Sequence, residues 1–427
     1  MSSAAPTSIE IKPRMDAAAK LAVFVSRSEL PTSARVTIQS LAQQIHCWDA
    51  FVDITFRKFA SGFAHKHLKI HAADHVPETV MERLSAMTSL RALASLRVLG
   101  TQLRFHKTCI ASTGADYAYV KGPTLAKQSK INLNNRFSRD VDVLVARRHL
   151  RKILNAAKAA GYLFRLQDDQ DPELPSSKDI HFLSKYADVV TLFDTSGVPI
   201  EVHTRLDKLS LNFTLERAKQ LGSFVDVSLP GATVKTFSPT LHFTYICYHH
   251  SRHFWSKLHW LADIDALQRL PEFDAVEANR IAEAIGIGPS IKASLEFTSL
   301  ISNPTQWSEK DLQRTGGGQF LKACLMNLDG DLEREEKLRE TMQLSDFMSA
   351  WQVSSGRYSG FWRESWLRRI RPSVTQYVEN RYPRGFYWVY SVRNAIQLAQ
   401  NGFNLILRSN KKTTARSQND GQATVSH

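Results

Sequence analysis

The chain has 427 residues, and its 55 lysines and arginines exceed its 41 acidic residues by a formal charge of +14. A hydrophobic content of 43% is enough for sizeable cores and excludes wholesale disorder. No apolar stretch reaches the roughly 20 residues of a membrane-spanning helix, and the N-terminus lacks the apolar core of a secretory signal. Four widely spaced cysteines without a CxxC pair argue against a zinc site or a disulfide scaffold. We therefore expect a cytoplasmic protein of two or three domains.

The N-terminal quarter of the chain changes from polar to helical in pattern. Residues 1–35 are polar and contain three prolines, so we expect a mobile N-terminal segment there with at most one short helix. Residues 36–112 have helical spacing of apolar side chains. Leucines recur at every third position from Leu90 to Leu99, which predicts an amphipathic helix.

Residues 113–235 alternate between strand and helix patterns and predict an α+β core. A helix is expected over Ala146–Ala160, ended by Gly161. Short aromatic or β-branched runs predict the strands. These runs are Tyr117–Val120, Val141–Val145, Tyr162–Leu166, Asp179–Leu183, Val189–Phe193 and Ile200–His203.

The remainder of the chain is predicted to be mainly helical. Residues 236–315 have helical spacing, and residues 316–409 form a helical, aromatic and basic region. The tail at 410–427 is polar and predicted to be disordered. Residues 351–427 hold twelve basic and three acidic side chains, so this last part carries 12 − 3 = +9 of the net charge.

Two carboxylates of the core lie one residue apart on a predicted strand. Because side chains alternate along a strand, Asp140 and Asp142 point to the same face. Two convergent carboxylates raise each other's pKa, and a divalent cation such as Mg²⁺ relieves this cost. Glu201 on a later strand is the expected third carboxylate. Three such groups can hold two metal ions about 3.5–4 Å apart, an arrangement that serves phosphoryl transfer.

Basic residues and a glycine surround this acidic motif in the sequence. Lys121 and Gly122 follow the first predicted strand, where a glycine allows backbone N–H groups to approach a phosphate closely. Arg136 and Arg139 directly precede the acidic pair, and guanidinium groups suit bidentate contacts with phosphate. We therefore assign all four residues to nucleotide binding.

The order of these motifs resembles the nucleotidyltransferase superfamily that includes DNA polymerase beta. It is most similar to a large group of bacterial nucleotidyltransferase family proteins, and the resemblance covers roughly residues 85–400. The motifs that carry it are Lys121-Gly122, Arg136, Asp140-Val-Asp142, Glu201-Val-His203, His249, His253, Leu258-His-Trp260-Leu261-Ala-Asp263 and Tyr382-Pro383-Arg384.

The resemblance implies a polymerase-beta-like mixed sheet, flanked by N-terminal and C-terminal helical regions. It implies transfer of a nucleoside monophosphate from an NTP to a hydroxyl acceptor, with release of pyrophosphate and with Mg²⁺ or Mn²⁺ as cofactor. Asp140 and Asp142 would bind both metal ions, and Glu201 would complete the site. The acceptor would be a small molecule, such as a saccharide or natural-product intermediate. A toxin-like protein adenylyltransferase and a non-catalytic nucleotide-binding or scaffold protein are the alternatives.

One departure from the superfamily concerns the phosphate-binding turn. The wider superfamily has Gly-Ser there, whereas this chain has Lys121-Gly122-Pro123. Proline has no backbone N–H, so Pro123 removes one donor from the turn. The sequence therefore leaves open how the triphosphate is held.

Three histidines are candidates for the acceptor side of the cleft, which the helical domain at 236–315 would complete. His249 and His253 lie four residues apart on one face of a predicted helix, a spacing that can bind zinc. No glutamate sits at the second place and no third ligand follows, so we place them on the acceptor side. His203 lies one strand step from Glu201 and joins them there.

The C-terminal region is the remaining candidate for a partner surface. Its aromatic and basic side chains suit base stacking or contact with a membrane surface. No recognition motif for RNA or DNA accompanies them, so nucleic acid is not the expected partner. The oligomeric state is left open.

Overall fold

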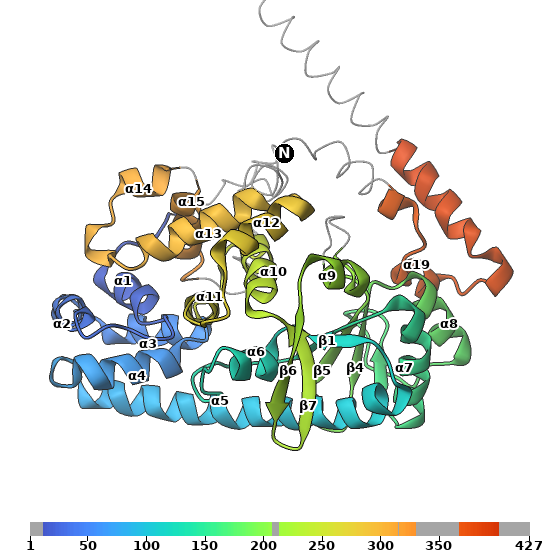
Figure 1. The fold of residues 1–427 in the computed structure, drawn as a ribbon, viewed down its shortest axis with the longest axis horizontal. Helices are drawn as coiled ribbons and strands as arrows, with labels where there is room; N and C mark the ends of the chain where they lie inside the picture. Colours follow the sequence, from blue (N-terminus) through green and yellow to red (C-terminus); the bar gives the residue numbers. More distant parts are fainter. Residues whose placement is uncertain (1–11, 207–212, 315, 330–366, 401–427) are drawn as a thin grey trace, which may run out of the picture.

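A computed structural model describes residues 12–206, 213–314, 316–329 and 367–400. A five-stranded mixed sheet lies on the right of Figure 1, with most of the N-terminal helices at the lower left and most of the later helices above them. The expected α+β class is therefore confirmed. The predicted disordered tail at 410–427 lies outside the described residues, as do residues 330–366 and 401–409 of the region at 316–409.

Five helices precede the sheet. They are α1 (Ala17–Phe24), α2 (Ala34–Gln43), α3 (Trp48–Arg57), α4 (Ser61–His71) and α5 (Glu78–Phe105). Helix α1 falls within the segment expected to be mobile, yet Leu21, Val23 and Phe24 are buried. Asp16 caps the helix by accepting a hydrogen bond from the Ala19 N–H. Residues 17–24 therefore belong to the core, because this short apolar run has a partner surface to pack against.

Helix α5 runs along the lower edge of the molecule in Figure 1. Leu90, Leu93 and Leu96 are 66%, 61% and 53% exposed, whereas Leu99 is buried. A spacing of three residues drifts around a helix of 3.6 residues per turn, so these leucines do not share one buried face. The predicted helix is present, but its buried face is not the leucine series.

Helix α4 contains a buried histidine that makes the stability pH-dependent. The Nε2 atom of His67 lies 3.0 Å from the Arg27 carbonyl oxygen, and burial lowers the pKa of His67 to about 4. Between pH 6.5 and 4 the unfolded chain therefore binds a proton that the folded chain rejects, and stability falls as the pH falls. We expect a loss of about 2–3 kcal/mol across this range from His67 alone.

Urea unfolding at pH 7.5 and pH 4.5 measures this loss. The variant His67→Gln keeps a donor for the Arg27 carbonyl and cannot be protonated, so its stability should change less between the two pH values. An identical pH dependence in both proteins would contradict this role of His67.

The central sheet is formed by five short strands in the order β1-β2-β5-β4-β3. Strands β2 and β5 pair in parallel, whereas the other neighbours are antiparallel. The strands are β1 (Tyr117–Tyr119), β2 (Val141–Val145), β3 (Leu163–Arg165), β4 (Val189–Phe193) and β5 (Pro199–His203).

The two faces of β2 have different environments. Val141, Val143 and Val145 pack into one hydrophobic core with side chains of α5 and of α7 (Arg147–Ala159). Asp142 and Leu144 point to the opposite face because side chains alternate along a strand. The acidic residue therefore faces away from the apolar core of the sheet.

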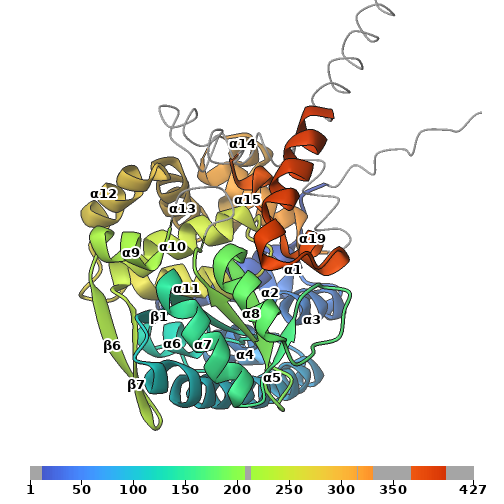
Figure 2. The same ribbon diagram turned by 90° about the vertical axis from the view of Figure 1, so that its right-hand side faces the viewer.

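One predicted strand is wrong. Asp179–Leu183 lies inside helix α8 (Ser177–Tyr186). Ser176 begins this helix with a capping box, in which its side chain accepts from the Asp179 N–H and the Asp179 carboxylate accepts from the Ser176 N–H. The apolar residues Ile180 and Leu183 then recur at helical spacing. Helices α7 and α8 lie together over the sheet in Figure 2.

A β-hairpin beside the sheet was not predicted. Strands β6 (Phe224–Leu229) and β7 (Ala232–Phe237) pair through a tight turn at Gly231, whose φ is +88°. The Thr236 hydroxyl donates to the Tyr119 carbonyl oxygen at 2.6 Å, which joins β7 to β1. The alternating apolar residues and the Pro-Gly turn were the local signals for this hairpin.

The remaining described helices are short, and none of them is both long and apolar enough to cross a membrane. Two lie near the sheet, and the others form the group beyond it (Figure 1). They are α6 (Gly122–Gln128), α9 (Leu215–Leu221), α10 (Pro239–Arg252), α11 (His259–Gln268), α12 (Ala275–Ile285), α13 (Gly288–Leu300), α14 (Glu309–Gln313) and α15 (Gly317–Met326).

Residues 367–400 form a C-terminal segment that packs against α8 (Figure 2). The ring of Tyr377 in α19 (Val374–Glu379) stacks on Phe182 with centroids 4.1 Å apart. The Tyr377 hydroxyl donates a 2.8 Å hydrogen bond to Asp179. This buried contact links the end of the described chain to the core.

Tyr377→Phe should loosen this segment, because it removes a hydrogen bond to a carboxylate and keeps the ring. We expect a loss of about 1–2 kcal/mol in local stability, measured as faster amide hydrogen exchange in residues 374–400. Tyr186→Phe is the matched control, since the Tyr186 hydroxyl makes no hydrogen bond among the described residues. Equal exchange in both variants would show that this hydrogen bond does not hold the segment.

Candidate active site

The floor of the site is formed by carboxylates on two adjacent parallel strands. Asp142 on β2 is the register partner of Glu201 on β5. Asp140 directly precedes β2 and has the same parity as Asp142. The parallel pairing therefore brings together Asp142 and Glu201, which are about 60 residues apart in the chain. The third predicted carboxylate, Asp140, lies at the start of β2.

Two basic side chains contact this acidic floor. The Nζ atom of Lys121 lies 2.8 Å from Oδ1 of Asp142. The Nε2 atom of His203 lies 3.1 Å from the same oxygen and 3.2 Å from Oε2 of Glu201. The predicted residues Lys121 and His203 are therefore part of the site, and His203 bridges the two carboxylates.

These contacts shift the ionisation of every member. Burial alone would lower the pKa of His203, but its bonds to Asp142 and Glu201 outweigh burial and raise the pKa to about 9. Burial raises the pKa of Asp142, but Lys121 and His203 together hold it well below its usual value. Burial and the neighbouring Asp142 raise the pKa of Asp140 to about 6. The floor is thus a compact anionic site that is neutralised by two protein cations.

The residues present fit a divalent metal ion. Ligand atoms of Asp142, Glu201 and His203 all lie within 4.8 Å of one another. The Oδ2 atom of Asp142 is buried and has no hydrogen-bond partner among the described residues. A buried carboxylate oxygen without a partner is costly, and a bound cation would satisfy it. Asp140 lies beside this group rather than within it.

The turn after β1 is held by a buried ion pair. Gly122 has a φ of +60°, which a glycine adopts without strain. Arg136 donates from Nη1 to the Gly122 carbonyl oxygen at 3.3 Å. Its Nε and Nη2 atoms bind both carboxylate oxygens of Asp263 at 2.5 and 3.0 Å. Arg136 is therefore buried and engaged within the protein, and it connects the turn to α11.

The acidic floor opens into a cleft of about 970 Å³. Arg139 is exposed at this cleft, and the predicted His249 and His253 line it together with Tyr245 and Trp260. The cleft therefore collects all of the predicted site residues except Asp142, which lies in its floor.

The model of the uncharacterised nucleotidyltransferase family matches residues 46–302, which is more than half of the chain. The chain belongs to this family. No curated protein and no solved structure matches it. The resemblance stated from the motifs is thus confirmed, and the family implies transfer of a nucleotidyl group in the general sense. The Tyr382-Pro383-Arg384 motif lies beyond the matched residues.

Three histidines at the end of α10 contact Trp260, and two of them, His249 and His253, line the cleft. His249 and His253 have ring centroids 4.7 Å apart. His250 is stacked on Trp260, with centroids 4.5 Å apart and planes 5° from parallel. Burial holds the pKa of His249 and of His250 well below the usual value, so these rings are neutral. The arrangement is an aromatic wall rather than a charged one.

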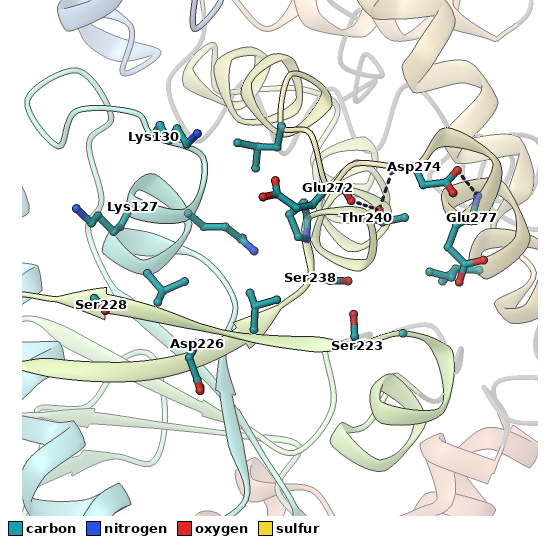
Figure 3. Close-up of a pocket in the computed structure, with 17 residues that line it drawn as sticks. Lys127, Lys130, Ser223, Asp226, Ser228, Ser238, Thr240, Glu272, Asp274 and Glu277 are labelled. Atoms are coloured by element: carbon teal, nitrogen blue, oxygen red, sulfur yellow. Dashed lines mark hydrogen bonds between the residues drawn. The ribbon is translucent and has the colours of Figure 1, made fainter.

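The protein has a second pocket of about 690 Å³, between α6, the β6–β7 hairpin, α10 and α12 (Figure 3). Two of its acidic residues serve the local structure. Asp274 caps α12 by accepting from two backbone N–H groups, and Glu277 pairs with Arg280. Thr240 joins α10 to the loop before α12 through the Asp274 N–H. This pocket does not contain the carboxylate cluster.

Several residues that line the cleft were not among the site residues predicted from the sequence. Arg252 and Lys257 lie beside quoted motifs, so their position in the chain was a usable signal. The others come from distant segments and have no local signal. The missed residues are Phe59, Phe137, Asp168, Asp188, Arg205, Tyr245, Arg252, Lys257, Arg368 and Arg369.

Proposed function

We propose that this protein is a metal-dependent nucleotidyltransferase that transfers a nucleoside monophosphate from an NTP to a hydroxyl acceptor and releases pyrophosphate. The observation that carries the proposal is the pairing of Asp142 with Glu201 across parallel strands, together with a buried Oδ2 atom of Asp142 that has no hydrogen-bond partner among the described residues. A cation on these carboxylates would neutralise charge on the reacting phosphate.

The residues of the floor have distinct roles in this proposal. Asp140, Asp142 and Glu201 hold Mg²⁺ or Mn²⁺. Glu201 also accepts the proton of the acceptor hydroxyl, since its side chain is 36% exposed to the cleft and its carboxylate is kept ionised by the hydrogen bond from His203. Lys121 stays protonated beside Asp142, because the attraction of that carboxylate outweighs burial and raises its pKa.

The basic residues divide into two groups. Arg139 lies exposed at the cleft, where it is available to the phosphates of the NTP. Arg136 positions the Gly122 turn instead of contacting the nucleotide, because Asp263, Ser138 and Gly122 take up its donors. His203, His249 and His253 lie toward the acceptor.

The test is release of pyrophosphate from each of the four NTPs, with Mg²⁺, with Mn²⁺ and with EDTA. We expect metal-dependent release that is stimulated by an acceptor. A labelled protein band after incubation of lysate with α-labelled ATP would favour a protein adenylyltransferase. Tight metal-dependent NTP binding without turnover on any acceptor would favour a non-catalytic nucleotide-binding protein.

A further inference from the structure

A cluster of aromatic and basic side chains forms a wall of the cleft that the acidic floor does not use. It consists of Phe59, Phe137, Arg91, Arg139 and Lys257, and we name it the Phe59 cluster. All of its members except Arg91 line the same cleft as Asp140 and Glu201. Arg91 lies behind the two rings, 4.6 Å from the Phe59 centroid and 5.0 Å from the Phe137 centroid.

Three cations surround the single ring of Phe59. Besides Arg91, the guanidinium carbon of Arg139 lies 5.3 Å from the ring centroid, and Nζ of Lys257 lies 5.4 Å from it. The face of an aromatic ring attracts cations but has no net charge. The ring therefore gathers three positive charges without neutralising their mutual repulsion.

The two arginines of this cluster are not paired with carboxylates in the described part of the chain. Among the described residues, neither Arg91 nor Arg139 forms an ion pair. The Nε and Nη1 atoms of Arg91 are buried and have no hydrogen-bond partner there. Burial and the nearby Arg139 lower the pKa of Arg91 to about 10. An anion bound at the cluster would relieve this unfavourable charge.

The backbone of Phe59 is strained. It follows the C-terminus of α3 in a Schellman motif, in which the Ala60 N–H donates to Thr55 and the Phe59 N–H donates to Phe56. The φ of Phe59 is +61°, a conformation that favours glycine at this position. Strain of this kind is found preferentially at functional sites, because the gain in function offsets its cost.

Four distant segments meet at the cluster, since Arg91 comes from α5. The turn after α3 brings Phe59, the turn before α11 brings Lys257, and the approach to β2 brings Arg139. The two turns are tied together by a 2.9 Å hydrogen bond from the Leu258 N–H to the Lys58 carbonyl oxygen. Arg139 immediately precedes Asp140, so the cluster adjoins the acidic floor.

We infer that the Phe59 cluster is a binding subsite for a phosphate group at the wall of the cleft. Guanidinium forks match the geometry of phosphate oxygens, and an ammonium group adds a point charge. The source of the phosphate rests on the proposed function: it is either a terminal phosphate of the NTP or a phosphate carried by the acceptor. The subsite would supply the binding that the Lys121-Gly122-Pro123 turn lacks.

The test is isothermal titration of Arg139→Gln, Lys257→Gln and the double variant with inorganic phosphate and tripolyphosphate, at constant ionic strength. We expect affinity for tripolyphosphate about tenfold weaker in each single variant and about a hundredfold weaker in the double variant. Arg97→Gln makes the same charge change on the exposed side of α5 and should leave the affinity within twofold. The side chains of Arg139 and Lys257 are both solvent-accessible, so these variants should retain the fold.

Further titrations identify the source of the phosphate. Weaker binding of α,β-methylene-ATP with unchanged binding of AMP would assign the cluster to the NTP. Unchanged nucleotide binding, with loss of phosphate binding to the nucleotide-saturated protein, would assign it to the acceptor. The inference is overturned if the wild-type protein binds neither phosphate nor tripolyphosphate, or if the double variant binds every probe as the wild type does. Loss of tripolyphosphate affinity in a protein that turns over no NTP would support the subsite and refute the proposed function.

Discussion

Asp142→Asn should lower metal-dependent release of pyrophosphate by about a thousandfold or more. The change removes a charge at the centre of the acidic floor, and losses of this size follow removal of one group that stabilises transition-state charge. The measurement is kcat for pyrophosphate release with saturating NTP, Mg²⁺ and acceptor.

Two further variants make this result interpretable. Asp226→Asn makes the same chemical change at an exposed ion pair with Lys235 on the hairpin, and it should leave kcat unchanged. Because Asp142→Asn also leaves Lys121 buried beside a neutral amide, its folding must be checked by circular dichroism. Because the Glu201 side chain is partly exposed, Glu201→Gln should lose activity with little loss of stability. Full activity in folded Asp142→Asn and Glu201→Gln would refute the assignment of the floor.

Asp263→Ala should destabilise the protein by about 3–5 kcal/mol. It leaves the Arg136 guanidinium buried without its partner, and an uncompensated buried charge has a cost of this size. Both side chains are at most 4% exposed, so solvent screens the pair very little. Urea unfolding followed by circular dichroism measures the loss.

The exposed pair of Arg57 and Asp53 on α3 is the matched control. Asp53→Ala should cost less than about 1 kcal/mol, because solvent screens that pair. The double variant Arg136→Met with Asp263→Leu should recover much of the stability, since apolar residues can replace a buried ion pair. The same double variant should still lose activity, because the Gly122 carbonyl no longer receives the Arg136 hydrogen bond. Equal losses at Asp263 and Asp53 would contradict this account.

Local patterns predicted much of the fold where the signal lay within a few residues. The strands around Val141–Val145 and Val189–Phe193 and the helical character of residues 236–315 were predicted from periodicity. The strand predicted at Asp179–Leu183 was wrong, because a short apolar run is compatible with a strand or with a helix. The capping box at Ser176 favours the helix.

The leucines from Leu90 to Leu99 show a second limit of prediction from sequence periodicity. The helical spacing was correct, but the buried face of α5 includes Arg91, Ser95 and Gln102. Which face a long helix buries depends on the elements that pack against it, and here those elements include the aromatic rings around Arg91. Helix periodicity alone does not contain this information.

The sequence by itself determined which carboxylates form the floor. Strand periodicity places Asp140 and Asp142 on one face, and the order of the motifs indicated the nucleotidyltransferase family that the family model confirms. Only the tertiary structure decided how the groups of the site contact one another. Parallel pairing sets Glu201 opposite Asp142, and burial pairs Arg136 with Asp263, 127 residues away. The Phe59 cluster likewise needs four separate segments. Periodicity is a property of neighbouring residues, whereas ion pairs and charge clusters depend on contacts that exist only after the chain has folded.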